Sequence, residues 1–324
     1  MRPSARSGLL LILITLILAA CGTGPAPAPT GTNTAIPASP TFLPVTVPAS
    51  PNGNSSPTAS PLPQVIQVAV IGDFGSGGSA EGQVATLVHG WKPDIILTVG
   101  DDNYELGAAD TIDAHIGQYY HDFISPYTGK YGAGADQNRF FPTLGNHDWY
   151  TAGAKPYLNY FTLPGNERYY DFTWGPVHFF ALDSDANEPD GVNQNSVQAQ
   201  WLHQALGGST SHWNVVYFHH PPYSSGMHGS TKWMRWPFAE WGADAVFSGH
   251  DHTYERLLVD SIPYFVDGAG GAVLYSFGNP LPETQFRYNT DHGAVLLTAS
   301  ETELLVEFYN HTGTLIDSYR QTKP

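Results

Sequence analysis

Residues 65–73 read Val-Ile-Gln-Val-Ala-Val-Ile-Gly-Asp, and residues 94–101 repeat the plan as Asp-Ile-Ile-Leu-Thr-Val-Gly-Asp. Each is a short apolar run closed by glycine and aspartate, which is typical of a buried strand that ends in a tight turn. Residues 80–91, between them, have the pattern of a helix. A strand, a helix and a second strand form the unit from which parallel sheets are built. This stretch therefore predicts an α/β fold.

The rest of the chain continues the alternation and then changes character. Further strands are predicted at residues 140–144, 169–173, 177–183, 213–218 and 244–247. Further helices are predicted at residues 110–124, 194–206 and 234–241. Beyond residue 252 the pattern is mostly of strands, at 253–259, 262–267, 293–299, 303–309 and 314–319. An alternating α/β part followed by a β-rich part predicts layered sheets covered by helices.

Five short polar motifs lie at the ends of predicted strands. They are Gly72-Asp73, Gly-Asp-Asp-Asn-Tyr at 100–104, Gly-Asn-His-Asp at 145–148, Val-Tyr-Phe-His at 216–219 and Gly-His-Asp-His at 249–252. Loops beyond the carboxyl ends of strands gather at one edge of such folds. Carboxylate, amide, phenol and imidazole groups together are the ligands for two neighbouring hard or borderline cations. Two such ions can clamp the oxygens of a displacement at phosphorus, so the motifs predict a two-metal phosphoesterase.

The set of motifs, in this order, resembles that of the calcineurin-like metallophosphoesterases and is most similar to that of the purple acid phosphatases. The similarity runs from about Val68 to about Gly271. Tyr104, three residues after Asp101, is the mark of that subgroup. Residues 174–183 and the His-His-Pro-Pro-Tyr-Ser of residues 219–224 also resemble it. With the order of elements above, we expect a four-layer α/β/β/α sandwich of two mixed sheets flanked by helices.

The resemblance implies seven metal ligands, one of which is shared. The first ion would be bound by Asp73, Asp101, Tyr104 and His252. The second ion would be bound by Asp101, Asn146, His219 and His250. A phenolate favours Fe(III), whereas an amide oxygen with two imidazoles suits a divalent ion such as Zn, Mn or Fe. We therefore expect Fe(III) at the Tyr104 site, a divalent ion at the Asn146 site, and a metal-activated hydroxide as the nucleophile.

Three further residues are candidates for catalysis by the same resemblance. His147 is expected to point at the substrate, and Asp148 to orient it by accepting its ring N–H. His228, in a Gly-Met-His-Gly loop, is expected to be a second outer histidine. Both histidines could donate a proton to the leaving oxygen. His220 is expected to have a structural or supporting role.

The charge balance limits the partners. The formal net charge is −16, and Arg2 and Arg6 are the only charged residues before position 64. Residues 64–324 therefore carry 29 acidic and 11 basic side chains, a balance that argues against a nucleic-acid sleeve. Bound metal ions would supply the positive charge that small phosphate esters require. The oligomeric state is not indicated.

The first 63 residues predict an exported, anchored protein. Two arginines, an apolar run from Leu9 to Ala20 and then Cys21 resemble a bacterial lipoprotein signal, with Cys21 as the lipidated residue. A plain secretory signal or a membrane anchor is the alternative. Residues 22–63 are rich in Pro, Thr and Ser and are predicted to be a disordered tether. Residues 64–324 would form the catalytic domain at the cell envelope or cell surface, with the membrane reached only through the lipid.

Two alternatives to a phosphomonoesterase follow from the same residues. The first keeps the site and changes the substrate, as in a phosphodiesterase or a nucleotide hydrolase. The second is a catalytically silent lipoprotein for adhesion or phosphate binding. The complete ligand set and the intact His147 argue against silence, because a binding module does not require a proton donor.

Overall fold

The computed structural model describes residues 65–324. The predicted signal segment with Cys21 and the predicted tether lie outside the described residues. Within residues 65–324, no helix combines the length and the apolar content that crossing a membrane requires.

The first sheet has six strands in the order β13-β12-β11-β1-β2-β3. These are β13 (Leu315–Thr322), β12 (Glu303–Asn310), β11 (Gly293–Ala299), β1 (Ile66–Ile71), β2 (Ile95–Thr98) and β3 (Phe140–Phe141). The three amino-terminal strands run parallel, whereas β11 lies antiparallel to β1 with Val68 opposite Leu297. The sheet is thus mixed, and strands from the two ends of the described chain meet at its centre.

The second sheet has seven strands in the order β10-β8-β9-β7-β6-β5-β4. These are β10 (Thr284–Tyr288), β8 (Tyr254–Val259), β9 (Ile262–Asp267), β7 (Ala245–Ser248), β6 (Trp213–Tyr217), β5 (Val177–Ala181) and β4 (Tyr170–Trp174). Strands β5, β6, β7 and β9 are parallel, and β4, β8 and β10 are antiparallel to their neighbours.

Alternate residues of the second sheet enter two different cores. Phe179 and Phe247 are fully buried in the core that also contains the first sheet. Their sequence neighbours Phe180 and Val246 are buried in a second core that contains residues of the two helices α5 (Val197–Gly208) and α6 (Phe238–Trp241). A period of two along a strand produces this separation, because successive side chains point to opposite faces.

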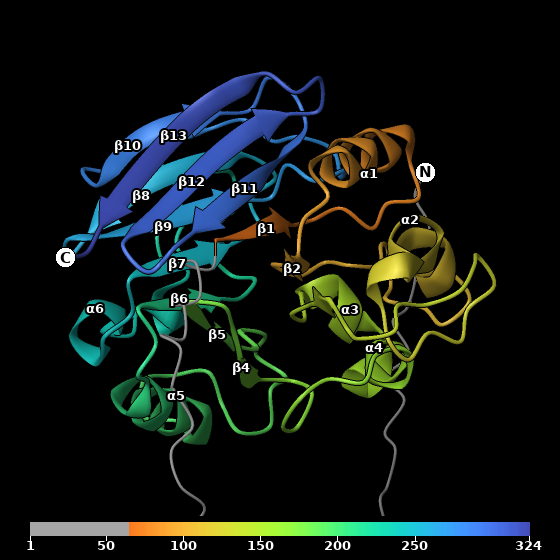
Figure 1. The fold of residues 1–324 in the computed structure, drawn as a ribbon, viewed down its shortest axis with the longest axis horizontal. Helices are drawn as coiled ribbons and strands as arrows, with labels where there is room; N and C mark the ends of the chain where they lie inside the picture. The colour runs from red at the N-terminus through yellow and green to blue at the C-terminus, as the bar shows by residue number, and fades with distance from the viewer. Residues whose placement is uncertain (1–64) are drawn as a thin grey trace, which may run out of the picture. The chain divides into compact units, whose positions relative to one another are not determined.

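Helices complete the outer layers, as Figure 1 shows. Helix α1 (Ser79–Trp91) lies beside β1 and buries Val84 and Val88, one turn apart, against the first sheet. Helices α2 (Gln118–Tyr120), α3 (Asn146–Tyr150) and α4 (Lys155–Tyr160) follow near β2 and β3. Helices α5 and α6 lie along the outer side of the second sheet. The predicted four-layer α/β/β/α sandwich is confirmed.

Some local predictions were wrong. The helix predicted at residues 110–124 is a π-helical turn (Asp113–Gly117), the short α2 and a 3₁₀ turn (His121–Phe123). Side-chain hydrogen bonds explain the break, because the Asp113 carboxylate accepts from the hydroxyls of Tyr127 and Tyr160. The helix predicted at 234–241 is a 3₁₀ turn (Lys232–Met234) followed by α6. Strand β10, helices α3 and α4 and a 3₁₀ turn (Ala152–Ala154) were not predicted.

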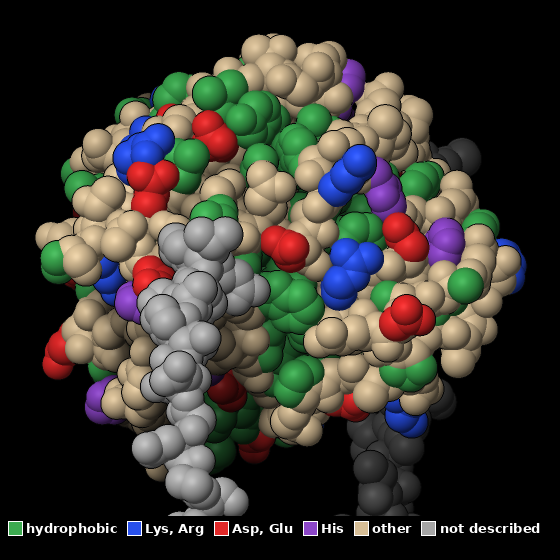
Figure 2. Space-filling model, viewed as in Figure 1, with side chains coloured by type: hydrophobic (Ala, Val, Ile, Leu, Met, Phe, Trp, Pro, Cys, Tyr) green, Lys and Arg blue, Asp and Glu red, His purple; other side chains and the backbone are tan. Residues whose placement is uncertain are grey.

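The face in Figure 2 presents isolated charges. Its Lys and Arg side chains stand apart from one another, with Asp and Glu side chains among them. That face therefore carries no continuous basic stripe of the kind that follows a nucleic-acid backbone.

Candidate metal centre

The five motifs converge where strands of both sheets end. The first sheet contributes Asp73 after β1, Asp101 after β2 and Asn146 after β3. The second sheet contributes His219 after β6, and residues 250 and 252 after β7. The two sheets therefore supply opposite sides of one site.

The backbone at these strand ends is unusual. Asp73, Asp101 and His250 have φ angles of 53°, 54° and 69°, in the left-handed region that few non-glycine residues adopt. Such strain persists only where the surrounding structure enforces it, and it is common at functional sites. Gly100, at φ 88°, has no alternative, because a Cβ there would lie 2.7 Å from His219 Nδ1.

The Tyr104 hydroxyl is the centre of the first group of donor atoms. It lies 3.1 Å from Asp73 Oδ1, 3.0 Å from Asp101 Oδ2 and 3.0 Å from His252 Nε2. The other ring nitrogen of His252, Nδ1, lies 2.8 Å from the Val273 carbonyl oxygen. Since a carbonyl only accepts, that nitrogen carries the proton and Nε2 presents a lone pair to the group.

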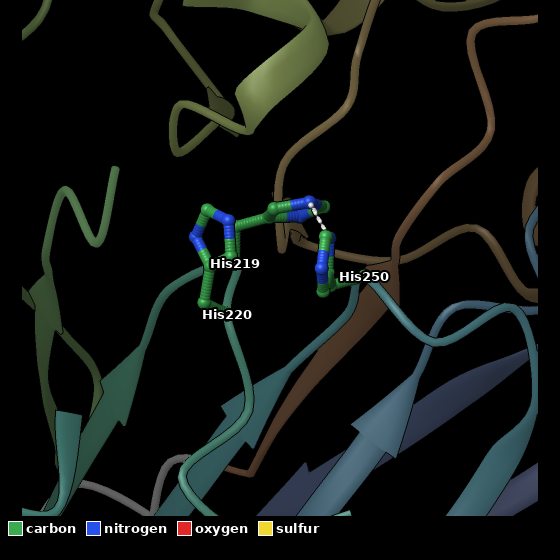
Figure 3. Close-up of side chains that lie close together, drawn as sticks. All are labelled: His219, His220 and His250. Atoms are coloured by element: carbon green, nitrogen blue, oxygen red, sulfur yellow. Dashed lines mark hydrogen bonds between the residues drawn. The ribbon is translucent and has the colours of Figure 1, made fainter. Parts of the chain in front are cut away.

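His219 is the centre of the second group. Its Nε2 lies 3.1 Å from Asn146 Oδ1, 3.2 Å from His250 Nδ1 and 3.4 Å from Asp101 Oδ2. Its Nδ1 donates to the Val99 carbonyl at 2.8 Å, which directs Nε2 toward the other members of the group. Figure 3 shows the contact between the rings of His219 and His250, which meet edge to face, with His220 beside them. Asp101 Oδ2 belongs to both groups and joins them.

Both groups have more acceptors than protons, which is what a cation site requires. A single phenol proton cannot serve Asp73, Asp101 and His252 at the same time. In the second group, at most one proton on His219 Nε2 faces the Asn146 amide oxygen, a ring nitrogen of His250 and the Asp101 carboxylate. Two clusters of side chains each have their ligand atoms within 4.8 Å of one another. One contains Asp73, Asp101 and His252, and the other contains His219, His220 and His250. The chemistry of the donors therefore fits two metal ions.

The carboxylates of Asp101 and Asp73 raise the pKa values of two of the proposed ligands, His219 and Tyr104. Burial opposes the charged form of His219, but Asp101 and Asp73 outweigh it and raise the pKa of the ring to about 10. Burial, together with Asp101 and Asp73, raises the pKa of Tyr104 well above its usual value. A metal ion bound by these groups would therefore displace their protons.

His147 lies at the mouth of the centre. Its Nδ1 donates to the Glu105 carbonyl at 2.7 Å, and its Nε2 is 3.9 Å from Asp101 Oδ2. Its backbone N–H donates to Asp101 Oδ1 at 2.8 Å. The ring is therefore held from two sides, with Nε2 directed toward the metal ligands.

The predicted contact between Asp148 and the His147 ring was wrong. Asp148 is buried in the first turn of α3, where its Oδ2 accepts the backbone N–H groups of Gly145 at 2.9 Å and Asp102 at 3.2 Å. Burial and the nearby Asp101 raise the pKa of this carboxyl to about 7. A side chain at the third position of a helix reaches back to the helix start, away from the neighbouring ring. The residue that orients His147 is Glu105, through its carbonyl.

His228 lines the same cavity as His147. Its ring stacks on that of His250, with centroids 4.3 Å apart, and its backbone N–H donates to Asp251 Oδ1 at 2.7 Å. A cavity of about 200 Å³ is lined by both outer histidines and by ligands of both groups. The structure thus brings all the predicted site residues except Asp148 to one cavity or to the metal groups beneath it.

Two residues of the cavity, Tyr150 and Tyr275, were not predicted from the sequence. Tyr150 and Tyr275 also line the cavity, and His220 is buried beneath it with Nδ1 2.9 Å from the Ser184 hydroxyl. Burial and the neighbouring His219 lower the pKa of His220 to about 3, so its ring is neutral. The repeated His-His of residues 219–220 was the available signal for His220. Tyr275 follows a glycine-rich loop, a weak signal without the fold.

Comparisons with known proteins agree with the geometry. A family model described as calcineurin-like phosphoesterase matches residues 66–254. The chain is 26% identical over 300 residues to purple acid phosphatase 3 of Arabidopsis thaliana, covering 78% of this chain and 76% of that protein. A solved purple acid phosphatase from yellow lupin (Lupinus luteus) seeds shares the fold with a TM-score of 0.64 and 20% identity. That match covers 81% of this chain and 55% of the lupin chain.

The fold is also found in a protein described by another role. GAP50, the anchor in the inner membrane complex of Plasmodium, matches with a TM-score of 0.61 and 17% identity, over 80% of this chain and 89% of its own. Fold likeness alone therefore does not decide what a chain does, and the argument for chemistry must come from the site.

Proposed function

Since the chain belongs to the calcineurin-like phosphoesterase family, we propose that it is a phosphatase of the purple acid phosphatase type, which hydrolyses phosphomonoesters with two metal ions. The observation that supports this most directly is the shared position of Asp101. Its Oδ2 lies 3.0 Å from the Tyr104 hydroxyl and 3.4 Å from His219 Nε2, so one carboxylate oxygen joins both groups of donor atoms.

Each group would hold one ion. Tyr104, Asp73, Asp101 and His252 would bind Fe(III), because phenolate and carboxylate oxygens favour a hard trivalent ion. Asn146, His219, His250 and Asp101 would bind a divalent ion, of which Zn, Mn and Fe(II) are the candidates. Two such ions, when bound, activate water as a nucleophile and offset the negative charge that builds up on the phosphate oxygens.

The outer histidines act on the leaving group. His147 is fixed with Nδ1–H on the Glu105 carbonyl, so Nε2 is the nitrogen that could pass a proton to a leaving oxygen in the cavity. His228 lines the same cavity. A substrate phosphate in that cavity would be within reach of two donors, one from α3 and one from the segment after β6.

The proposal is tested by metal content and turnover together. The purified protein should hold about two metal ions, as expected for a two-ion site, and should hydrolyse monoesters faster than diesters or nucleoside triphosphates. Asp101→Ala should remove both ions and all activity, whereas Asp110→Ala, at an exposed aspartate, should change neither. Activity that survives Asp101→Ala would refute the two-metal mechanism. A preference for diesters would instead support a phosphodiesterase at the same site.

We also propose that the protein is exported and anchored through a lipid on Cys21, with residues 22–63 as a tether and residues 64–324 as the catalytic domain. The support is the sequence alone: two arginines, the apolar run from Leu9 to Ala20, and a cysteine that is the only one in the chain. Cys21→Ala should release the full-length protein from membranes. If that variant stays in the membrane fraction, the lipid is not the anchor.

A further inference from the structure

Exposed apolar side chains gather at the mouth of the centre. Nine large hydrophobic side chains are exposed among residues 65–324, and four of them lie within a few positions of a site residue in the sequence. These four are Leu106, Tyr150, Met227 and Val273, with exposures between 58% and 80%. Of these four, Tyr150 and Val273 line the cavities beside the metal ligands.

Two tyrosines contact the two outer histidines. The Tyr150 ring lies 4.8 Å from the His147 ring, and the Tyr275 ring lies 5.3 Å from the His228 ring. Tyr275 also stacks on His252 with centroids 4.0 Å apart and planes 12° from parallel. Both tyrosines line the cavity of about 200 Å³ that contains the proton donors. A leaving group that receives a proton from His147 or His228 must therefore lie close to aromatic rings.

The surroundings of the cavity disfavour a second anionic group. A neighbouring cavity of about 370 Å³ shares His147, His252 and Tyr275 with the first, and Val273 belongs to its wall. Among the described residues that line the two cavities there is no Lys or Arg. The exposed Glu105 adds a carboxylate to the larger one. A carboxylate or a further phosphate on the leaving group would meet the Glu105 carboxylate with no Lys or Arg in either lining to offset it.

We propose that Tyr150 and Tyr275 form a subsite for the leaving group, and that it selects monophosphate esters of neutral aromatic alcohols. This inference rests on the proposed phosphatase function and names its substrate class. The metals and outer histidines would bind the phosphate, while the tyrosines cover the ring of the alcohol by offset or edge-to-face contact. Nucleoside polyphosphates would be poor substrates, because their charged phosphates lie where these cavities offer no Lys or Arg.

The test compares benzyl phosphate with ethyl phosphate, whose leaving alcohols have similar acidity. Covering one aromatic ring should favour the benzyl ester in kcat/KM by about 10-fold or more. The benzyl-to-ethyl ratio should fall toward one in Tyr150→Ala and Tyr275→Ala, with metal content measured for each variant. It should survive in Tyr150→Phe and Tyr275→Phe, which keep the rings, and in Leu315→Ala, an exposed apolar residue outside both cavity linings. A ratio near one in the unaltered protein, with both esters hydrolysed, would overturn the inference.

Two further measurements do not depend on turnover of these esters. Benzylphosphonate should bind more tightly than methylphosphonate by calorimetry, and Tyr275→Ala should remove the difference. If neither ester is hydrolysed, the phosphatase proposal fails, and the subsite proposal is then decided by phosphonate binding. Equal affinities for benzylphosphonate and methylphosphonate would overturn the subsite proposal. Benzyl phosphate with a ring carboxylate should be a poorer substrate than benzyl phosphate, and Glu105→Gln should narrow that gap. No discrimination against the carboxylate would contradict selection for neutral alcohols.

Discussion

Glu81→Gln should stabilise the protein increasingly as the pH rises from 4.5 to 9. Glu81 lies in the first turn of α1 and is fully buried, and burial raises the pKa of its carboxyl from 4.5 to about 9. One of its oxygens accepts the Gly77 N–H at 2.6 Å, and the other has no partner among the described residues. Glu81 lies close to the metal centre, because Gly271 packs against it and lines the larger cavity beside that centre, as does Gly78.

The sign and size follow from the two pKa values. The unfolded chain ionises at this position above about pH 4.5 and the folded chain only above about pH 9, so folding stability is lost as the pH rises between these values. At pH 7 the folding stability lost is about 3 kcal/mol, since each pH unit above the pKa of the unfolded chain lowers the stability by about 1.4 kcal/mol. Glutamine has the same shape and no charge. Its advantage should correspond to a melting temperature higher by about 6–12 °C at pH 7 for a domain of this size.

The measurement is thermal unfolding of both proteins, metal-loaded, at several pH values from 4.5 to 9. The difference in melting temperature should grow steadily with pH, because ionisation of Glu81 in the unfolded chain lowers the folding stability of the unaltered protein and glutamine cannot ionise. Glu301→Gln, at an exposed position, should show no such trend. A Glu81→Gln difference that is constant with pH would refute the assignment of a neutral buried carboxyl.

Three further predictions concern the metal centre. Tyr104→Phe should abolish a visible absorption band of the iron-loaded protein while the circular dichroism spectrum is kept; a colourless, iron-free protein with full activity would contradict the Fe(III) assignment. His147→Ala should lower turnover of alkyl phosphates by about 10²–10⁴-fold with both metals retained, and less for nitrophenyl phosphate, whose leaving group requires less protonation; equal losses for all esters would reject a proton donor. Removal of the metals by a chelator should lower the melting temperature, because the ligands come from both sheets and bind ions only in the folded state; an unchanged melting temperature would show that the ions add nothing to the fold.

The strands that end at the site could be predicted because their signal is local. Residues 65–73 and 94–101 are apolar runs long enough for buried strands, and Gly72 and Gly100 mark where each strand stops. Strand β10 has no such signal, because all its residues are half-exposed or exposed and it forms only by pairing with β8. The helix predicted at 110–124 was broken by the contacts of Asp113 with two distant tyrosines, which no local pattern contains.

Side-chain direction was less predictable than position. Asp148 follows His147 in sequence, but the helical turn at α3 sends its carboxylate back to Gly145 and Asp102. Tyr275 reaches the site through a long loop that no pattern connects to the histidines. Backbone carbonyls such as that of Val273, which fix the tautomers of the ligands, carry no sequence signal, since every residue has one.

The pairing of β1 with β11 determines when the protein can finish folding. Val70 lies opposite Val295, so the strand that carries Asp73 completes its hydrogen bonds only after nearly the whole chain has been made. Such distant pairing slows folding and leaves partly folded chains with unpaired strand edges. A nascent chain that has passed residue 252 already contains every proposed metal ligand, but one side of β1 is still open. A stop codon after residue 252 and before residue 293 would therefore yield a chain that holds all the proposed metal ligands and tends to aggregate through β1.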